Sequence, residues 1–160
     1  MQSETNTRTL KTFYAAFAAR DGKAMSSCYH RDAQFRDEVF DLRGAEVGAM
    51  WRMLCERGKD LRIEATNLMA EGESGSADWQ AWYAFSATGR SVHNRVHSRF
   101  QFRDGLIIEQ VDSFSFATWS RQALGPIGVL LGWSSLLKRK VRANARIALT
   151  AYMANEIPAS

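Results

Sequence analysis

Cysteine and proline are scarce in this 160-residue sequence, with two residues of each. Cys28 and Cys55 are too few for the disulfide framework of a small secreted domain. They also have no metal-ligand spacing to His30, His93 or His97, so no metal site is predicted. We therefore expect two reduced, buried thiols in a cytoplasmic protein.

The sequence also lacks long hydrophobic runs, so it offers no candidate transmembrane segment. Residues 1–9 are polar and lack the apolar stretch of a signal peptide. With 46% hydrophobic and 24% charged residues, the composition is that of one folded domain that can bury a core.

The main body of the sequence has no excess of either charge. Residues 134–160 carry five basic residues and one acid, which account for the whole net charge of +4. The residues before them hold 16 basic and 16 acidic side chains. A nucleic-acid-binding domain is expected to concentrate positive charge on its body, so we predict no nucleic-acid partner.

Apolar residues recur at helical spacing in the N-terminal third of the chain. Helices are expected over residues 5–20 and 22–28, with Asp21 capping the second, and between Gly44 and Gly58. Residues 33–36 are expected to form a short strand. The first and third helical patterns are carried by Leu10, Phe13, Tyr14 and Phe17, and by Val47, Met50, Trp51 and Leu54.

Residues 61–116 change to a period of two, which is typical of strands with one apolar face. Turn signals at 72–76, 88–90 and 103–105 divide this segment into four strands. Helices followed by such a meander predict an α+β fold with an antiparallel sheet. The four apolar faces are Leu61, Ile63 and Ala65; Ala77, Trp79, Ala81, Tyr83, Phe85 and Ala87; Val92, Val96, Phe100 and Phe102; and Leu106, Ile108, Phe114 and Phe116.

The predicted architecture is a cone-like, curved antiparallel sheet covered by three N-terminal helices, with a pocket inside the cone. We assign residues 1–120 to this α+β domain. Residues 121–160 are predicted to form a helical extension that packs on it. Within that extension, 125–133 is expected to act as a lid over the pocket and 134–155 to form an amphipathic helix.

Several short motifs resemble, in order and spacing, those of the SnoaL-like and ketosteroid isomerase-related branch of the nuclear transport factor 2-like superfamily. The resemblance covers residues 5–120. It implies a cystatin-like roll, a pocket for a small molecule, and a homodimer formed through the outer face of the sheet. The motifs are residues 13–17, 20–22, 29–37, 42–44, 99–102, 104–107 and 112–114.

The ketosteroid isomerase site combines an Asp base, a Tyr donor and a protonated Asp donor. By resemblance, the base position is Asp37. The tyrosine position falls on Phe13, with Tyr14 beside it, and the second donor position falls on Ser98. Because Phe cannot donate a hydrogen bond and Ser is a weaker donor than a carboxylic acid, a strict ketosteroid isomerase is not expected.

Polyketide cyclases and limonene epoxide hydrolases instead keep an acid on the last strand, and the corresponding residue here is Asp112. The epoxide hydrolases also carry Arg-x-Asp on the preceding strand. Val96 and Ser98 stand there in this chain, which disfavours epoxide hydrolysis.

Strand periodicity supports two of these positions independently of any family. Ser98 has the parity of Phe100, and Asp112 has the parity of Phe114, so both are predicted to point inward. An acid on an apolar face must either be paired or titrate with a raised pKa. A raised carboxyl pKa is what a general acid or base needs near neutral pH. The alternatives are a purely structural acid at Asp112 and a solvent-facing turn residue at Asp37.

Two hypotheses follow for function. In the first, the protein is an isomerase, cyclase or dehydratase without metal or organic cofactor, in which Asp37 or Asp112 moves a proton and Tyr14, Tyr83 or Ser98 orients an oxygen. In the second, it is a ligand-binding or dimerisation module without chemistry. Both place a small apolar or polycyclic molecule in the pocket. The predicted ligand-binding residues are Phe13, Phe17, Trp51, Trp79, Tyr83, Phe85, Ser98 and Phe100.

The basic side of the 134–155 helix has two interpretations. A plain solvated face is the favoured one. Contact with an anionic membrane is the alternative, because the apolar residues 127–133 precede the helix.

Overall fold

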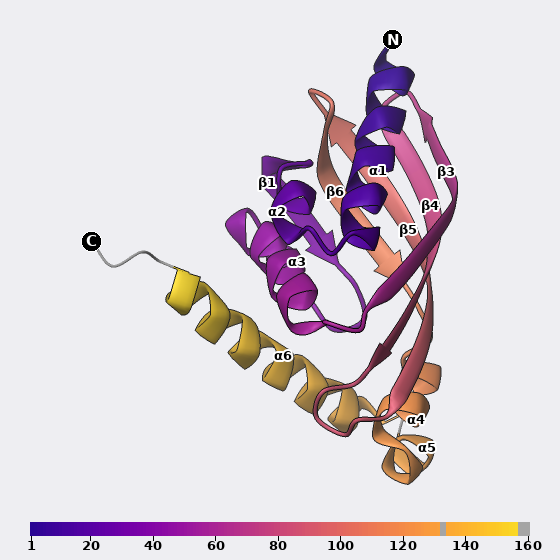
Figure 1. Ribbon diagram of the computed structural model, residues 1–160, viewed down its shortest axis with the longest axis vertical. Coiled ribbons are helices and arrows are strands. Elements are labelled where there is room, and N and C mark those ends of the chain that lie inside the picture. The colour runs from indigo at the N-terminus through magenta and orange to yellow at the C-terminus, as the bar shows by residue number, and fades with distance from the viewer. Residues whose placement is uncertain (132–133, 157–160) are drawn as a thin grey trace.

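The computed structural model describes residues 1–131 and 134–156, which form six helices and one six-stranded sheet (Figure 1). The three helices and four meander strands expected from the sequence are all present. In chain order the elements are α1 (Gln2–Ala18), α2 (Gly22–Ser26), β1 (Tyr29–Arg36), β2 (Asp41–Arg43), α3 (Ala45–Arg57), β3 (Arg62–Glu71), β4 (Ser74–Ala84), β5 (Ser91–Arg103), β6 (Leu106–Ser113), α4 (Phe116–Leu124), α5 (Pro126–Leu131) and α6 (Ser135–Glu156).

The strands lie in the order β2-β1-β6-β5-β4-β3. The four strands β3 to β6 form the predicted antiparallel meander. At the other edge, β1 runs parallel to β6, a junction that the sequence did not indicate. The connection from β1 and β2 to the meander runs through the helix α3 and not through a hairpin. A hairpin would require antiparallel strands, whereas a connection through a helix permits β1 to run parallel to β6.

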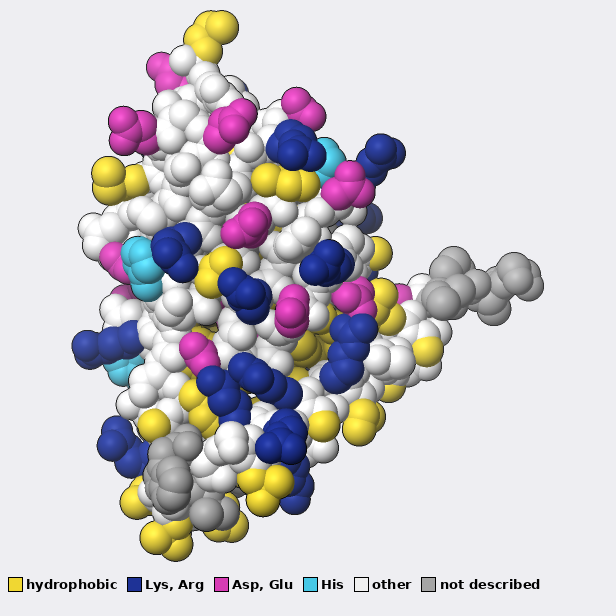
Figure 2. All heavy atoms as spheres, turned by 180° about the vertical axis from the view of Figure 1, so that it is seen from behind, with side chains coloured by type: hydrophobic (Ala, Val, Ile, Leu, Met, Phe, Trp, Pro, Cys, Tyr) yellow, Lys and Arg dark blue, Asp and Glu magenta, His cyan; other side chains and the backbone are white. Residues whose placement is uncertain are grey.

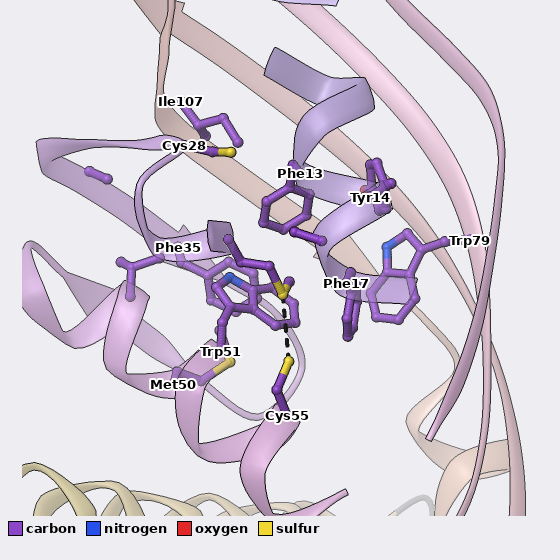
Figure 3. Packing of buried hydrophobic residues seen from close by; sticks show 14 of the residues in the cluster. Phe13, Tyr14, Phe17, Cys28, Phe35, Met50, Trp51, Cys55, Trp79 and Ile107 are labelled. Atoms are coloured by element: carbon purple, nitrogen blue, oxygen red, sulfur yellow. Dashed lines mark hydrogen bonds between the residues drawn. The ribbon is translucent and has the colours of Figure 1, made fainter. Parts of the chain in front are cut away.

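The helices α1, α2 and α3 lie on one side of the curved sheet (Figure 1). Aromatic side chains from α1, α3 and β4 meet there at edge-to-face angles, which aromatic rings prefer (Figure 3). The ring centroid of Phe17 lies 4.9 Å from that of Trp51 and 5.1 Å from that of Trp79. Cys28 and Cys55 are free and buried in the same core, as expected.

The phase of β6 differs from the simple alternation predicted for it. Gln101 pairs with Glu109, but Phe102 pairs with Ile107, so Ile108 is an extra residue in a bulge. Ile107 is therefore fully buried, whereas Ile108 is only half-buried. Beyond the bulge the alternation resumes with Asp112 inward, as predicted.

Phe116 does not continue the strand as predicted. It begins α4, because the hydroxyl of Ser115 accepts a hydrogen bond from the backbone N–H of Thr118 at 3.1 Å and caps the helix.

The helix α6 confirms the amphipathic helix expected over 134–155, and it packs along α3 (Figure 1). Arg52 of α3 binds Glu156 at 2.8 Å, and the hydroxyl of Tyr152 donates to Glu56 at 2.7 Å. Leu149 is completely buried in the main core. No helix in the described parts of the chain is long and apolar enough to cross a membrane.

Replacement of Leu149 by Ala should lower the free energy of unfolding by about 2–4 kcal/mol, because it leaves a cavity in the core. The neighbouring Ile147 is 69% exposed on the opposite side of α6. Ile147→Ala should therefore change the free energy of unfolding by less than about 0.5 kcal/mol. Urea unfolding of both variants measures the difference, and equal effects would contradict the docking of α6 on the core.

Candidate functional site

A cavity of about 340 Å³ opens between α3, α6 and the inner face of β4, β5 and β6. Its volume is at the lower end of the ~300–1,000 Å³ typical of small-molecule sites. The wall is mostly apolar, and two carboxyl groups, Asp37 and Asp112, form part of it. The structure thus brings together the two acids that the sequence singled out.

The predicted lining residues divide into two groups. Five of them line the cavity: Phe17, Trp51, Trp79, Tyr83 and Phe85. The other four predicted positions, Phe13, Tyr14, Ser98 and Phe100, are buried in the core and are not among the lining side chains.

The burial of Phe13 and Tyr14 has a packing cause. The ring of Phe13 packs at 5.7 Å from that of Trp51, so α1 turns this face to the core and not to the cavity (Figure 3). The hydroxyl of Tyr14 is buried and makes no hydrogen bond within the described residues. Burial raises the pKa of Tyr14 well above its usual value.

Asp112, on β6, is 3% exposed and its carboxyl group is held by two side-chain donors. Its Oδ1 accepts a hydrogen bond from the hydroxyl of Ser98 at 2.5 Å and from Nε2 of Gln110 at 2.9 Å. The Ser98 hydroxyl in turn accepts from the indole N–H of Trp79 at 2.8 Å. These bonds fix the rotamer of Asp112 from the core side.

The hydrogen-bonded chain continues beyond Gln110. The Oε1 atom of Gln110 accepts a hydrogen bond from the hydroxyl of Tyr29. That hydroxyl accepts from the indole N–H of Trp51 at 2.7 Å. The amide of Gln110 is therefore oriented so that its NH₂ group must face Asp112.

Burial is the main cause that raises the pKa of Asp112 to about 7. The hydrogen bonds from Ser98 and Gln110 act in the opposite direction, and the charge of Asp37 adds to the rise. Since Oδ1 already accepts two hydrogen bonds, the proton of the neutral acid belongs on Oδ2. Oδ2 makes no hydrogen bond in the part of the chain that the structure describes, so it is the oxygen left to face the cavity.

Asp37 lies in the turn that follows β1. Its Oδ1 accepts hydrogen bonds from the backbone N–H groups of Val39 at 2.7 Å and Phe40 at 2.6 Å. Burial raises the pKa of Asp37 to about 6, the two backbone donors oppose the rise, and Glu38 adds to it. Asp37 is thus a turn residue, but it is half-buried in the cavity wall and does not simply face solvent, as the alternative interpretation had it.

Tyr83 supplies a polar group to the otherwise apolar wall. Its hydroxyl accepts a hydrogen bond from the indole N–H of Trp119 at 2.8 Å, which leaves its own proton available to donate. Burial raises the pKa of Tyr83, so the hydroxyl stays protonated at neutral pH.

Sequence reasoning missed several contributors. Gln110 shares the parity of Asp112 two residues away, and this signal could have found it. Trp119 and the α6 residues Ala145 and Ala148 also line the cavity. Their place depends on how the C-terminal helices fold back, which local periodicity does not encode.

The predicted lid over residues 125–133 is not found in its described part. Among the described lining residues, the C-terminal segment contributes from α4 and α6, whereas α5 packs on α4. The Cβ position of Gly128 would overlap the backbone of Ser120, so α5 packs closely on α4. Residues 132 and 133 of the predicted lid lie outside the described residues.

A family model described as a SnoaL-like domain matches residues 10–110. No curated protein matches the sequence. Three solved structures with 14–18% sequence identity to this chain are similar to it in structure. At such low identity the similarity shows the fold alone.

A protein from Jannaschia sp. CCS1 described as a SnoaL-like polyketide cyclase has a TM-score of 0.68 and 14% identity over 78% of this chain and 95% of that one. An LEH-like epoxide hydrolase from M. tuberculosis has a TM-score of 0.62 and 18% identity over 86% and 98% of the two chains. TerC, crystallised with polyporic acid, has a TM-score of 0.62 and 15% identity over 74% and 97%.

The raised pKa of Asp112 predicts a specific dependence of stability on pH. The folded protein binds a proton at Asp112 up to pH about 7, whereas the unfolded chain releases it near the ordinary carboxyl pKa of 3.8. The free energy of unfolding should therefore fall as the pH rises between these values. Asp112→Asn removes the buried charge and keeps the acceptor for Ser98 and Gln110.

Asp112→Asn should consequently stabilise the fold at pH 8, by on the order of 2–4 kcal/mol at most, and have little effect near pH 4. Thermal unfolding across this pH range measures the difference. Asp41→Asn, which changes an exposed acid on the edge strand β2, is the matched control. A wild type that is as stable as Asp112→Asn at pH 8 would show that Asp112 does not carry a raised pKa.

Proposed function

The chain belongs to the SnoaL-like domain family, and we propose that it binds a small, largely apolar molecule in the cavity and transfers a proton on it. Asp37 and Asp112 are the proposed acid–base groups. The observation that carries the proposal is the carboxyl group of Asp112, which stands in an apolar wall with Oδ1 fixed by two donors and Oδ2 left for a ligand.

The two acids are proposed to take different roles. Between pH 6 and 7, Asp37 is the more ionised of the two and Asp112 the more protonated, since their pKa values are about 6 and about 7. Asp37 then removes a proton from the ligand as a carboxylate. Neutral Asp112 donates a hydrogen bond from Oδ2 to a ligand oxygen and stabilises the charge that develops there.

Tyr83 is proposed as a second donor to the same oxygen, because its free O–H lies in the cavity wall. Proton removal beside a carbonyl group is the step that isomerases, cyclases and dehydratases of this kind share. It moves protons only, so the proposed reaction needs no redox cofactor. Tyr14, a candidate from the sequence, has no part in this step, since its hydroxyl is buried outside the cavity wall.

Ligand binding without chemistry is the second candidate function. It is favoured by one observation. Phe13 occupies the position of the tyrosine donor in ketosteroid isomerases, and the hydroxyl of the adjacent Tyr14 is buried with no hydrogen-bond partner among the described residues. On this alternative, Asp112 orients a polar group of the ligand and transfers nothing.

A homodimer through the outer face of the sheet remains a prediction. That face is polar and carries an exposed contact of 2.7 Å between His97 and Asp78. Trp82 lies between His93, which stacks on it at 4.6 Å between ring centroids, and Arg62, whose Cζ lies 4.1 Å from its ring centroid.

Exchange of the α-hydrogens of a bound ketone for deuterium tests the proton transfer without knowledge of the natural substrate. Two- and three-ring ketones, 2-tetralone among them, are incubated in D₂O, and deuterium uptake is followed by NMR. The wild type should accelerate uptake for at least one ketone that binds. Asp37→Asn should reduce the acceleration by about 10²–10⁴-fold, because it removes the base.

Asp112→Asn should cause a smaller loss, because its amide can still donate a hydrogen bond into the cavity. Asp78→Asn should leave the rate unchanged, since this acid lies on the outer face of the sheet. Ketones that bind without any acceleration would decide in favour of binding without chemistry. Asp37→Asn and Asp112→Asn variants that accelerate exchange as much as the wild type would contradict the roles proposed for these two acids.

The pH dependence of the same exchange should be bell-shaped. Its rate constant should rise as Asp37 loses its proton at about pH 6 and fall as Asp112 loses its proton at about pH 7. Asp112→Asn should remove the alkaline limb and keep the acidic one. An alkaline limb that persists in this variant would assign the acid role to another group.

A further inference from the structure

The short helix α5 exposes apolar side chains to an unusual degree. Ile127 and Val129 are each 59% exposed, and Leu130 is 70% exposed. Their backbone is held against α4, so the side chains project from the end of the molecule. Figure 2 shows hydrophobic side chains and a group of Lys and Arg side chains at this same end.

The helix α6 also presents apolar side chains outward. Leu136 and Ile147 are 71% and 69% exposed, and positions 136, 140, 143 and 147 share one face at helical spacing. The opposite face is the one that buries Leu149 in the core. This helix therefore has an inner apolar face that docks on the domain. Its outer stripe consists of Leu136, Lys140, Ala143 and Ile147, and no described residue covers it.

The charges in and beside this stripe are positive. Arg139 and Lys140 are exposed and make no ion pair within the described ranges. Lys138, by contrast, is held by Glu38 at 2.5 Å, and Arg146 is held by Glu46. The first half of α6 therefore carries uncompensated positive charge next to exposed apolar side chains.

We propose that α5 and the outer stripe of α6 form a docking surface for an anionic lipid bilayer. We call it the α5–α6 surface and define it by Ile127, Val129, Leu130, Leu136, Arg139, Lys140 and Ile147. The apolar side chains enter the boundary between headgroups and acyl chains, while the basic side chains bind lipid phosphate and carboxylate groups. The helices lie on the membrane and do not span it.

Charge favours a bilayer over a second copy of the chain as the occupant. A two-fold contact through this surface would bring Arg139 and Lys140 of one copy close to the same residues of the other. Like charges held together at an interface weaken it. An anionic membrane supplies the opposite charge. Because a bilayer is fluid, it can also accept separate, protruding apolar side chains without a surface of complementary shape.

Co-sedimentation of the whole protein with lipid vesicles tests the proposal. Wild type should bind vesicles that contain about 30% phosphatidylserine in phosphatidylcholine at least tenfold more strongly than pure phosphatidylcholine, and salt should weaken the binding. Arg139→Glu with Lys140→Glu should reduce binding to the anionic vesicles at least tenfold. Leu130→Asp with Leu136→Asp should reduce it by a similar factor.

Two control variants make changes of the same kind elsewhere on the surface. Met69→Asp alters a side chain that is 64% exposed on β3, and Arg8→Glu with Lys11→Glu reverses two exposed charges on α1. Both should bind the anionic vesicles within about twofold of the wild type. All of these side chains are exposed, so circular dichroism melting should confirm that every variant is folded.

Three results would overturn the proposal. In the first, the wild type binds vesicles with phosphatidylserine no more strongly than vesicles of pure phosphatidylcholine. In the second, the controls lose as much binding as the α5–α6 variants. In the third, sedimentation velocity without vesicles shows a wild-type dimer that Leu130→Asp with Leu136→Asp dissociates. The last result would assign the surface to a second copy of the chain.

Discussion

Burial of the ionisable carboxyl group of Asp112 is the constraint on which the site depends. A charged carboxylate in an apolar wall is costly, and the fold meets this cost with hydrogen bonds and with protonation near neutral pH. The donors to Asp112 are themselves held by Trp79 and, through Tyr29, by Trp51. The indole groups that form the core thus also determine the orientation of the acid.

This arrangement joins stability and function in the same residues. The indole of Trp51 packs against α1 and β4 with its ring and anchors the polar chain with its N–H group. Asp37, the second acid, is held by its own turn and connected to α6, because Lys138 and Arg142 of that helix bind the side chain and the backbone carbonyl of Glu38. The α6 helix therefore supports the site on one face and carries the proposed lipid-binding stripe on the other.

The sequence was most informative where one local pattern decides the outcome. Helical spacing placed α1, α3 and α6, and alternation placed Ser98 and Asp112 on the inner face. The position of Asp112 was predicted correctly even though the bulge at Ile108 shifts the first half of β6, because the alternation resumes after the bulge. Two features depend on packing between distant segments, which no local pattern contains. They are the parallel β1–β6 pair and the contribution of α6 to the cavity wall.

The most direct test of the account is a ¹³C NMR titration of the Asp112 carboxyl group, assigned with Asp112→Asn. We predict an apparent pKa of about 7, which should decrease when Asp37→Asn removes the neighbouring charge. A carboxyl group that instead titrates near the ordinary pKa of 3.8 would contradict the central claim, because Asp112 would then be an ordinary ionised acid at neutral pH.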